Sequence, residues 1–160
     1  RLFEETLEGD YSGWEIYTDA GFGLAFMYPV NCGVVDSSDT SVEIEGKLDE
    51  EGNHWPVFRV EYHDSELYHP PEGADLRSWL GENDPVLSRE LGSEFMRFGD
   101  PVTIAGFLAD HVIFRSYQAV DQDLYYFVRG DQLYRITLFH VGRREDWDLY
   151  NKFLSSFTFF

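Results

Sequence analysis

Hydrophobic and polar residues alternate along much of the chain, which is the pattern of β-strands with one buried face. In the segment 21–29 (GFGLAFMYP) large side chains occupy every second position from Phe22, and Pro29 ends the run. Residues 41–47 (SVEIEGK) and 55–63 (WPVFRVEYH) repeat the alternation. The same criteria predict further strands over residues 95–104, 107–118, 124–129 and 132–141.

The period changes from two to about three and a half in three places, which predicts helices. Residues 74–80 (ADLRSWL) carry apolar side chains at helical spacing. Asp84 followed by Pro85 is typical of a helix start, so a short helix is expected as far as Leu91. Residues 143–156 form an amphipathic pattern, and residues 157–160 are expected to add a last short strand.

The segment 125–136 (YYFVRGDQLYRI) contains Arg129-Gly130-Asp131, a tripeptide that cell-surface receptors read. Two apolar strands flank Gly130-Asp131, and a two-residue loop that begins with Gly suits a type II′ turn. Arg129 should then pair with Gln132. Both faces of this hairpin are apolar, so we expect it in the middle of a sheet that is covered on both sides. The turn is the preferred interpretation over an adhesion signal.

Composition excludes several classes of partner. The 160 residues include 30 Asp and Glu against 12 Lys and Arg, for a net charge of −18. This charge repels phosphate backbones, so we expect no nucleic-acid partner and no binding to anionic membrane surfaces. Solubility is the simplest reason for the acidity, while a high-salt environment, cation binding and a basic partner remain open. No apolar run is long enough to span a bilayer.

The chain is expected to form one domain over residues 14–160, preceded by an acidic arm or tether over residues 1–13. Cys32 is the only cysteine, so an intrachain disulfide is excluded and a small core residue is the expected role. The chain begins with Arg1, and a signal or lipid-anchor segment removed ahead of it is one explanation.

One metal site is conceivable from the sequence. Glu61 and His63 share a strand face, and His69 approaches them if the following segment folds back. Nitrogen and oxygen ligands of this kind bind divalent cations. The competing interpretation is two solvated histidines beside an acidic surface, because no tight ligand spacing is present.

The remaining chemistry is sparse. Asp121 and Asp123 are expected to flank a turn, and solvated loops are the default for such acidic pairs. His111 and His140 lie on predicted strands, where a structural role is expected. No nucleophile elbow, phosphate-binding loop or zinc-protease motif occurs, so nothing in the sequence supports an enzyme. Trp55 and Tyr68 lie near expected loops and are candidates for a recognition patch, against ordinary packing.

With this layout, the chain resembles the PsbP-like family. The resemblance rests on GFGLAFMYP, VTIAGFLADHVIFRSYQ, the YYFVRGDQLYRITL hairpin and the closing NKFLSSFTFF. It implies an α+β fold with a mostly antiparallel sheet covered by helices on both faces, an α/β/α sandwich. It also implies a non-enzymatic binding or assembly module, located on the extracytoplasmic side of a bacterial envelope as a secreted or lipid-anchored domain. The alternative function is a metal-dependent enzyme or metal-binding protein that uses Glu61, His63 and His69.

Overall fold

The computed structural model describes residues 11–21, 23–30, 32–37, 41–47, 54–63, 70–71, 73, 75–84, 87, 96–115, 121–130, 132–140 and 144–160. Its elements follow the chain in this order: β1 Trp14–Asp19, β2 Leu24–Pro29, β3 Cys32–Ser37, β4 Ser41–Lys47, β5 His54–His63, α2 Leu76–Asn83, β6 Met96–Phe98, β7 Val102–Ile104, β8 Phe107–Phe114, β9 Asp121–Arg129, β10 Gln132–His140, α4 Arg144–Ser155 and β11 Thr158–Phe159.

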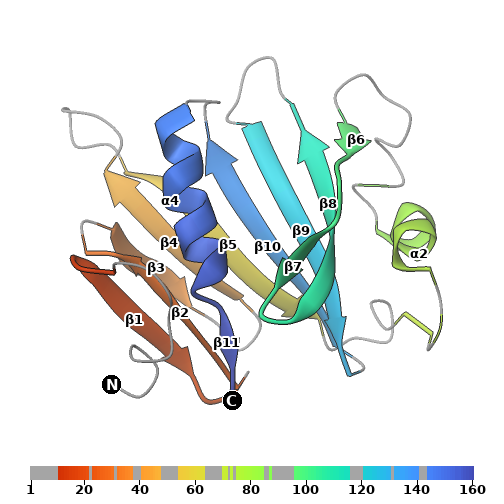
Figure 1. Ribbon diagram of the computed structural model, residues 1–160, viewed down its shortest axis with the longest axis horizontal. Helices are drawn as coiled ribbons and strands as arrows, with labels where there is room; N and C mark the ends of the chain where they lie inside the picture. The colour runs from red at the N-terminus through yellow and green to blue at the C-terminus, as the bar shows by residue number, and fades with distance from the viewer. Residues whose placement is uncertain are drawn as a thin grey trace.

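The strands form two antiparallel sheets (Figure 1). The large sheet has the order β3-β4-β5-β10-β9-β8-β6, with β7 paired to the other end of β8. The small sheet has the order β1-β2-β11. The β9–β10 hairpin lies in the middle of the large sheet and pairs Arg129 with Gln132, as predicted. Gly130 has a φ of +64°, which fits the first position of the predicted turn, while Asp131 lies outside the described residues.

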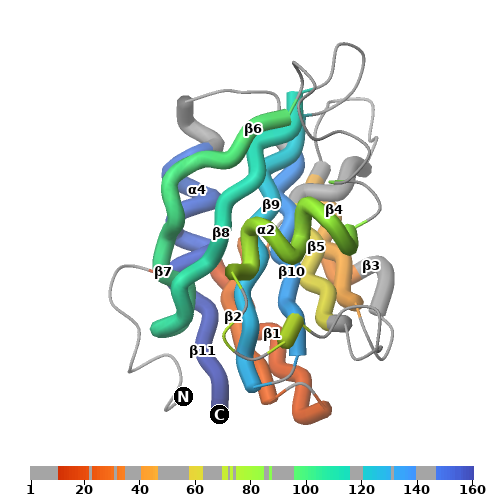
Figure 2. Tube along the Cα trace, turned by 90° about the vertical axis from the view of Figure 1, so that its right-hand side faces the viewer, coloured from red at the N-terminus to blue at the C-terminus, as the bar shows by residue number. Residues whose placement is uncertain are grey.

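One face of the large sheet, called here the α4 face, packs against α4 and the small sheet. Phe153 of α4 stacks on Phe58 of β5 with ring centroids 3.8 Å apart, and it meets Phe26 of β2 edge-on at 5.3 Å. These three rings are fully buried. Figure 2, which views the molecule from the β6 edge, places α4 on one side of the sheet. The aromatic-rich core that holds the two sheets together therefore lies under α4.

The opposite face, called here the α2 face, carries a second and smaller core. Leu80 of α2 packs with Leu124 and Tyr126 of β9 and with Leu133 of β10. The mostly antiparallel α+β fold is thus confirmed. The prediction that helices cover both faces is not confirmed. On the α4 face the small sheet provides much of the cover, and on the α2 face the eight-residue helix α2 packs against one part of the large sheet.

Some strand predictions need correction. The strand predicted over 95–104 is two short strands, β6 and β7, separated at Pro101, which has no N–H to donate to a ladder. β9 begins at Asp121 and contains Asp123, so these two residues do not flank a turn. The strand β3 was not predicted, because its sequence CGVVDS contains Gly33 and does not alternate between apolar and polar residues. Most of the helix predicted over 84–91 lies outside the described residues.

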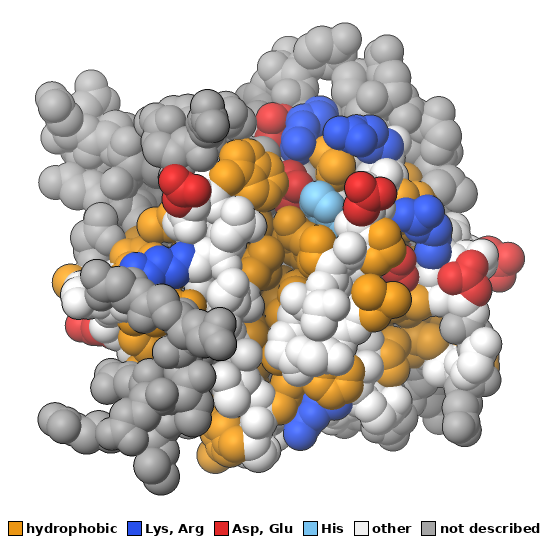
Figure 3. Space-filling view, in the orientation of Figure 1, with side chains coloured by type: hydrophobic (Ala, Val, Ile, Leu, Met, Phe, Trp, Pro, Cys, Tyr) orange, Lys and Arg blue, Asp and Glu red, His pale blue; other side chains and the backbone are white. Residues whose placement is uncertain are grey.

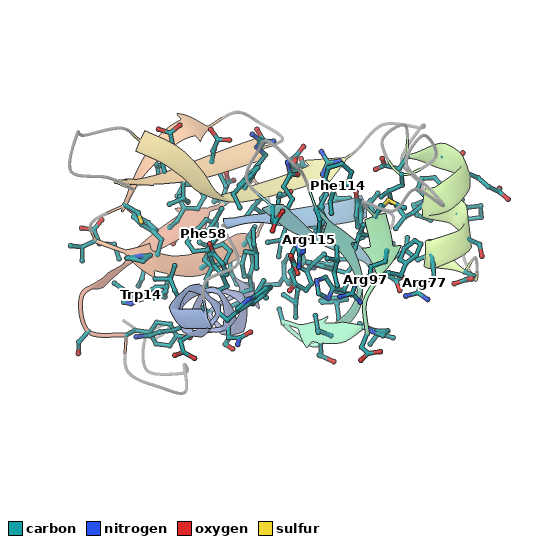
Figure 4. The ribbon with its side chains drawn as sticks, turned by 90° about the horizontal axis from the view of Figure 1, so that it is seen from above. Trp14, Phe58, Arg77, Arg97, Phe114 and Arg115 are labelled. Atoms are coloured by element: carbon teal, nitrogen blue, oxygen red, sulfur yellow. The ribbon has the colours of Figure 1, made fainter. Side chains whose placement is uncertain are left out.

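The start of the described chain is fastened to the domain. The Tyr11 hydroxyl donates a hydrogen bond to the Lys152 carbonyl oxygen of α4 at 3.0 Å. The Lys152 ammonium lies 5.0 Å from the ring centre of Tyr11 and 4.9 Å from that of Trp14, which Figure 4 shows beside α4. The part of the predicted arm that is described therefore docks on α4, and residues 1–10 lie outside the described residues. Among the described helices, none is long and apolar enough to cross a membrane.

Candidate functional site

The predicted metal ligands are only partly described. Both carboxylate oxygens of Glu61 accept hydrogen bonds from Arg135, at 3.1 Å from Nε and 2.6 Å from Nη2. The side chain of His63 and the whole of His69 lie outside the described residues. Within the part of the chain that is described, no group of three potential ligands forms. A cation at Glu61 would have to compete with the Arg135 guanidinium, and the divalent-cation hypothesis stays a prediction.

The predicted recognition aromatics are likewise not tested. The backbone of Trp55 lies in β5, opposite Gly46 of β4. Its side chain and the whole of Tyr68 lie outside the described residues.

The α2 face contains a buried polar cluster around Arg135, here called the Arg135 cluster. Nη1 of Arg135 lies 3.7 Å from Oδ2 of Asp84, in addition to the two hydrogen bonds that Arg135 donates to Glu61. Asp84 is 1% exposed, and its Oδ2 also accepts the Tyr126 hydroxyl at 3.3 Å. Oδ1 of Asp84 accepts the backbone N–H of Leu87 at 3.1 Å, which is the helix-capping contact that the sequence predicted there.

The Arg135 cluster ties α2 to the sheet. Among the described residues, the Arg135 guanidinium lies within 4 Å of both carboxylates and offsets part of their negative charge. Burial raises the pKa of the Tyr126 hydroxyl above its ordinary value, Asp84 raises it further, and Arg135 opposes the shift. The hydroxyl therefore remains protonated and acts as a hydrogen-bond donor. These contacts join β5, β10, β9 and the end of α2.

A second buried polar cluster, here called the Asp123 cluster, lies on the α4 face. Asp123 is 1% exposed; its Oδ2 lies 2.6 Å from Nε2 of His111, and its Oδ1 accepts a 3.0 Å hydrogen bond from Arg115. The His111 ring stacks on Tyr125 with centroids 4.5 Å apart. Burial, and after it the charge of Asp123, raises the pKa of the Tyr125 hydroxyl. In Figure 4, Phe114 and Arg115 lie on opposite sides of the sheet, as successive residues of a strand should.

Sequence reasoning assigned Asp123 to a solvated loop, although one signal pointed to burial. Asp123, Tyr125 and Phe127 are alternate residues of one strand and therefore share a face, which the hairpin prediction made apolar. A carboxylate that continues a buried face requires a partner. Gly99 makes room for that partner, because a Cβ added there would lie only 2.7 Å from Nδ1 of His111. The predicted structural role of His111 agrees with this geometry.

Arg129 of the Arg-Gly-Asp tripeptide packs onto the domain. Its guanidinium carbon lies 4.3 Å from the ring centre of Phe159 in β11. Phe159 in turn meets Phe127 and Tyr134 edge-on, at 6.0 and 5.2 Å. An adhesion motif needs its arginine on a protruding loop, whereas this side chain lies over an aromatic ring. The turn interpretation therefore accounts for the conformation of Arg129 and Gly130.

The α4 face is apolar at its surface beside α4 (Figure 3). Figure 3 shows hydrophobic side chains along a furrow between α4 and the β7–β8 hairpin. Ile136 and Leu138, which belong to the core of this face, are 0% exposed. Partly buried side chains, including Trp147 of α4 and Val102 of β7, pack over that core. The furrow therefore lies over a closed apolar core.

A scan against models of protein families and a search of curated proteins both find no match. Solved structures do match. The solution structure of cyanobacterial PsbP (CyanoP) from Synechocystis sp. PCC 6803 is 14% identical with a TM-score of 0.55, over 96% of each chain. A crystal structure of a protein from Bacteroides thetaiotaomicron VPI-5482 is 13% identical with a TM-score of 0.54, over 92% of this chain but only 49% of the other. The chain therefore has a PsbP-like fold.

Proposed function

We propose that this chain is a non-enzymatic binding or assembly domain. One observation carries the proposal: the described side chains best suited to catalysis are engaged by one another inside the fold. Nε2 of His111 faces Asp123, and the carboxylate of Glu61 is held by Arg135. Both pairs bridge neighbouring strands, β5 with β10 and β8 with β9, so they serve to hold the large sheet together. The PsbP-like fold supports the same proposal by analogy.

The proposal includes the type of partner and the location. A net charge of −18 disfavours nucleic acid and anionic lipid surfaces and favours a protein partner. The extracytoplasmic location implied by the resemblance is part of the proposal. Fractionation of source cells with an antibody against the chain tests it, and recovery of the chain with cytoplasmic markers would contradict it.

The binding proposal is tested by isolating a complex and rebuilding it from purified components. The wild-type chain and a His111→Gln variant are immobilised in parallel, and each candidate partner is then purified and its affinity measured. We expect a partner that binds both proteins equally, because His111 has a structural role. Chemical conversion of the captured molecule would contradict the proposal, whereas loss of binding in His111→Gln at unchanged thermal stability would contradict only the structural role of His111.

A further inference from the structure

Tyr125 carries a buried hydroxyl without a hydrogen-bond partner in the described part of the chain. The residue is 3% exposed and belongs to the core of the α4 face. The other buried tyrosines that the structure describes all donate a hydrogen bond: Tyr28, Tyr126, Tyr134 and Tyr150. An unpaired polar group in the interior costs stability, so groups of this kind are rare and need an explanation. Binding of an acceptor from outside the chain is such an explanation.

The hydroxyl lies beneath the furrow on the α4 face. Strand side chains stand roughly perpendicular to their sheet, so the hydroxyl of Tyr125 is the part of the residue farthest from β9 and nearest to the level of α4 and β7. In Figure 1, β9 passes behind the gap between α4 and β7, and Figure 3 shows the apolar furrow at the same place. The partly buried Trp147 of α4 and Val102 of β7 pack over the same core. The unpaired donor therefore lies under an apolar surface.

Arg97 is a second donor without a partner. Its side chain is exposed, and it alone of the Lys and Arg side chains that the structure describes has no hydrogen bond, ion pair or aromatic contact. Arg97 pairs with Ile113, which shares the α4 face with Arg115. Figure 4 labels both arginines on the side of the sheet that carries α4. The charge of Arg115 is offset by Asp121 and Asp123, so Arg97 is the cation left to bind an outside acid.

The spacing of the two donors favours an extended ligand. Tyr125 pairs with His111 and Arg97 with Ile113, so their backbones lie two strands and two residues apart, or roughly 12 Å. An extended peptide covers this separation with about four residues. A carboxylate suits the charged guanidinium, and a backbone carbonyl oxygen suits the neutral hydroxyl. Apolar side chains suit the furrow, which an inorganic anion would leave uncovered.

The net charge of −18 limits how acidic the ligand is. It repels a strongly acidic partner at long range, and it likewise opposes a second copy of this chain. A single carboxylate is still attracted to Arg97 at contact.

We propose that the furrow between α4 and the β7–β8 hairpin, with Arg97 at its rim, binds an extended segment of a partner protein in which one Asp or Glu accompanies apolar residues. The Tyr125 hydroxyl donates a hydrogen bond to this segment when the side chains above it part. This inference rests on the proposed binding function and specifies its surface and partner.

The test begins with selection of ligands of unrestricted sequence. A displayed library of random octapeptides is selected on the immobilised full chain. The enriched peptides are then synthesised with a fluorescent label, and their affinities are measured by anisotropy. We expect the enriched peptides to share one acidic residue among apolar ones.

Two pairs of variants separate the proposed contacts from general effects. Arg97→Gln removes the unpaired cation. Its control is Arg59→Gln, which changes the net charge equally on the opposite face of the large sheet. Tyr125→Phe removes the unpaired hydroxyl. Its control is Tyr134→Phe, because Tyr134 is buried on the same face but donates its hydroxyl to Gln132.

We expect Arg97→Gln to weaken peptide binding roughly tenfold or more and Tyr125→Phe roughly fivefold, whereas both controls should bind as the wild type does. Thermal unfolding distinguishes the two hydroxyls. Tyr134→Phe should lower Tm, because it breaks a hydrogen bond. Tyr125→Phe should leave Tm unchanged or raise it, because it removes an unpaired polar group.

Several results would overturn the inference. Selection that enriches no peptide, or only peptides without an acidic residue, would remove Arg97 as the contact for a carboxylate. Equal binding by the wild type, Arg97→Gln and Tyr125→Phe would place the peptides elsewhere. An equal fall in Tm for Tyr125→Phe and Tyr134→Phe would show that the fold already uses the Tyr125 hydroxyl.

Competition identifies other occupants. Displacement of the peptide by octanoate at equal affinity would identify a small apolar acid as the ligand, and displacement by the unlabelled chain would identify a second copy. Either result would overturn the inference. A complex rebuilt with a purified partner that binds all four variants equally would also overturn it, yet would still support the binding function.

Discussion

Replacement of Arg135 by Met should destabilise the fold strongly, because it removes the cation that two buried carboxylates share. Arg135 is 19% exposed, and its partners Glu61 and Asp84 are 15% and 2% exposed at their side chains. Methionine keeps most of the apolar stem and removes the charge. Removal of one partner of a buried ion pair costs about 3–5 kcal/mol. In a domain of this size the expected fall in Tm is roughly 6–20 °C.

Arg59→Met is the matched control on the same sheet face. Arg59 pairs with Glu43 across β4 and β5, but it is 40% exposed, so screening by solvent should keep its loss within about 1 kcal/mol. Urea unfolding followed by circular dichroism gives the change in the free energy of unfolding for each variant. Equal losses in the two variants, or a loss below about 1 kcal/mol for Arg135→Met, would refute the claim that burial of the Arg135 cluster determines its importance.

Other consequences are open to measurement. Gly99→Ala should cost about 1–3 kcal/mol in urea unfolding, because the new Cβ overlaps His111, whereas Gly33→Ala, with open space around it, should not; equal effects would contradict the packing argument. Burial raises the pKa of Tyr125, so the folded hydroxyl keeps its proton where the unfolded one loses it; stability should fall as pH rises above about 10, and less steeply in Tyr125→Phe. Parallel pH profiles would contradict this assignment. Lys152→Met should cost about 0.5–1 kcal/mol, through loss of the cation between two aromatic rings, and no change in thermal unfolding would show that the contact is not stabilising.

The alternation of side chains predicted much of the sheet, since it depends only on neighbouring residues. The register from Arg129 paired with Gln132 to Phe127 paired with Tyr134 follows from the position of Gly130. The same local reasoning failed around Pro101, where the sequence predicted one strand and the structure has two, β6 and β7. For the candidate site, sequence reasoning selected Glu61 but not its partner, because β5 and β10 lie far apart in the chain.

The sequence by itself determined which residues alternate, where the hairpin turns, that α4 is amphipathic and that the chain is strongly acidic. These properties depend on contacts within a few residues or on composition. Only the tertiary structure decided that Asp84, Glu61 and Arg135 meet, and that β3 ends the sheet. Such outcomes depend on the order and register of strands distant in sequence, which no local pattern encodes.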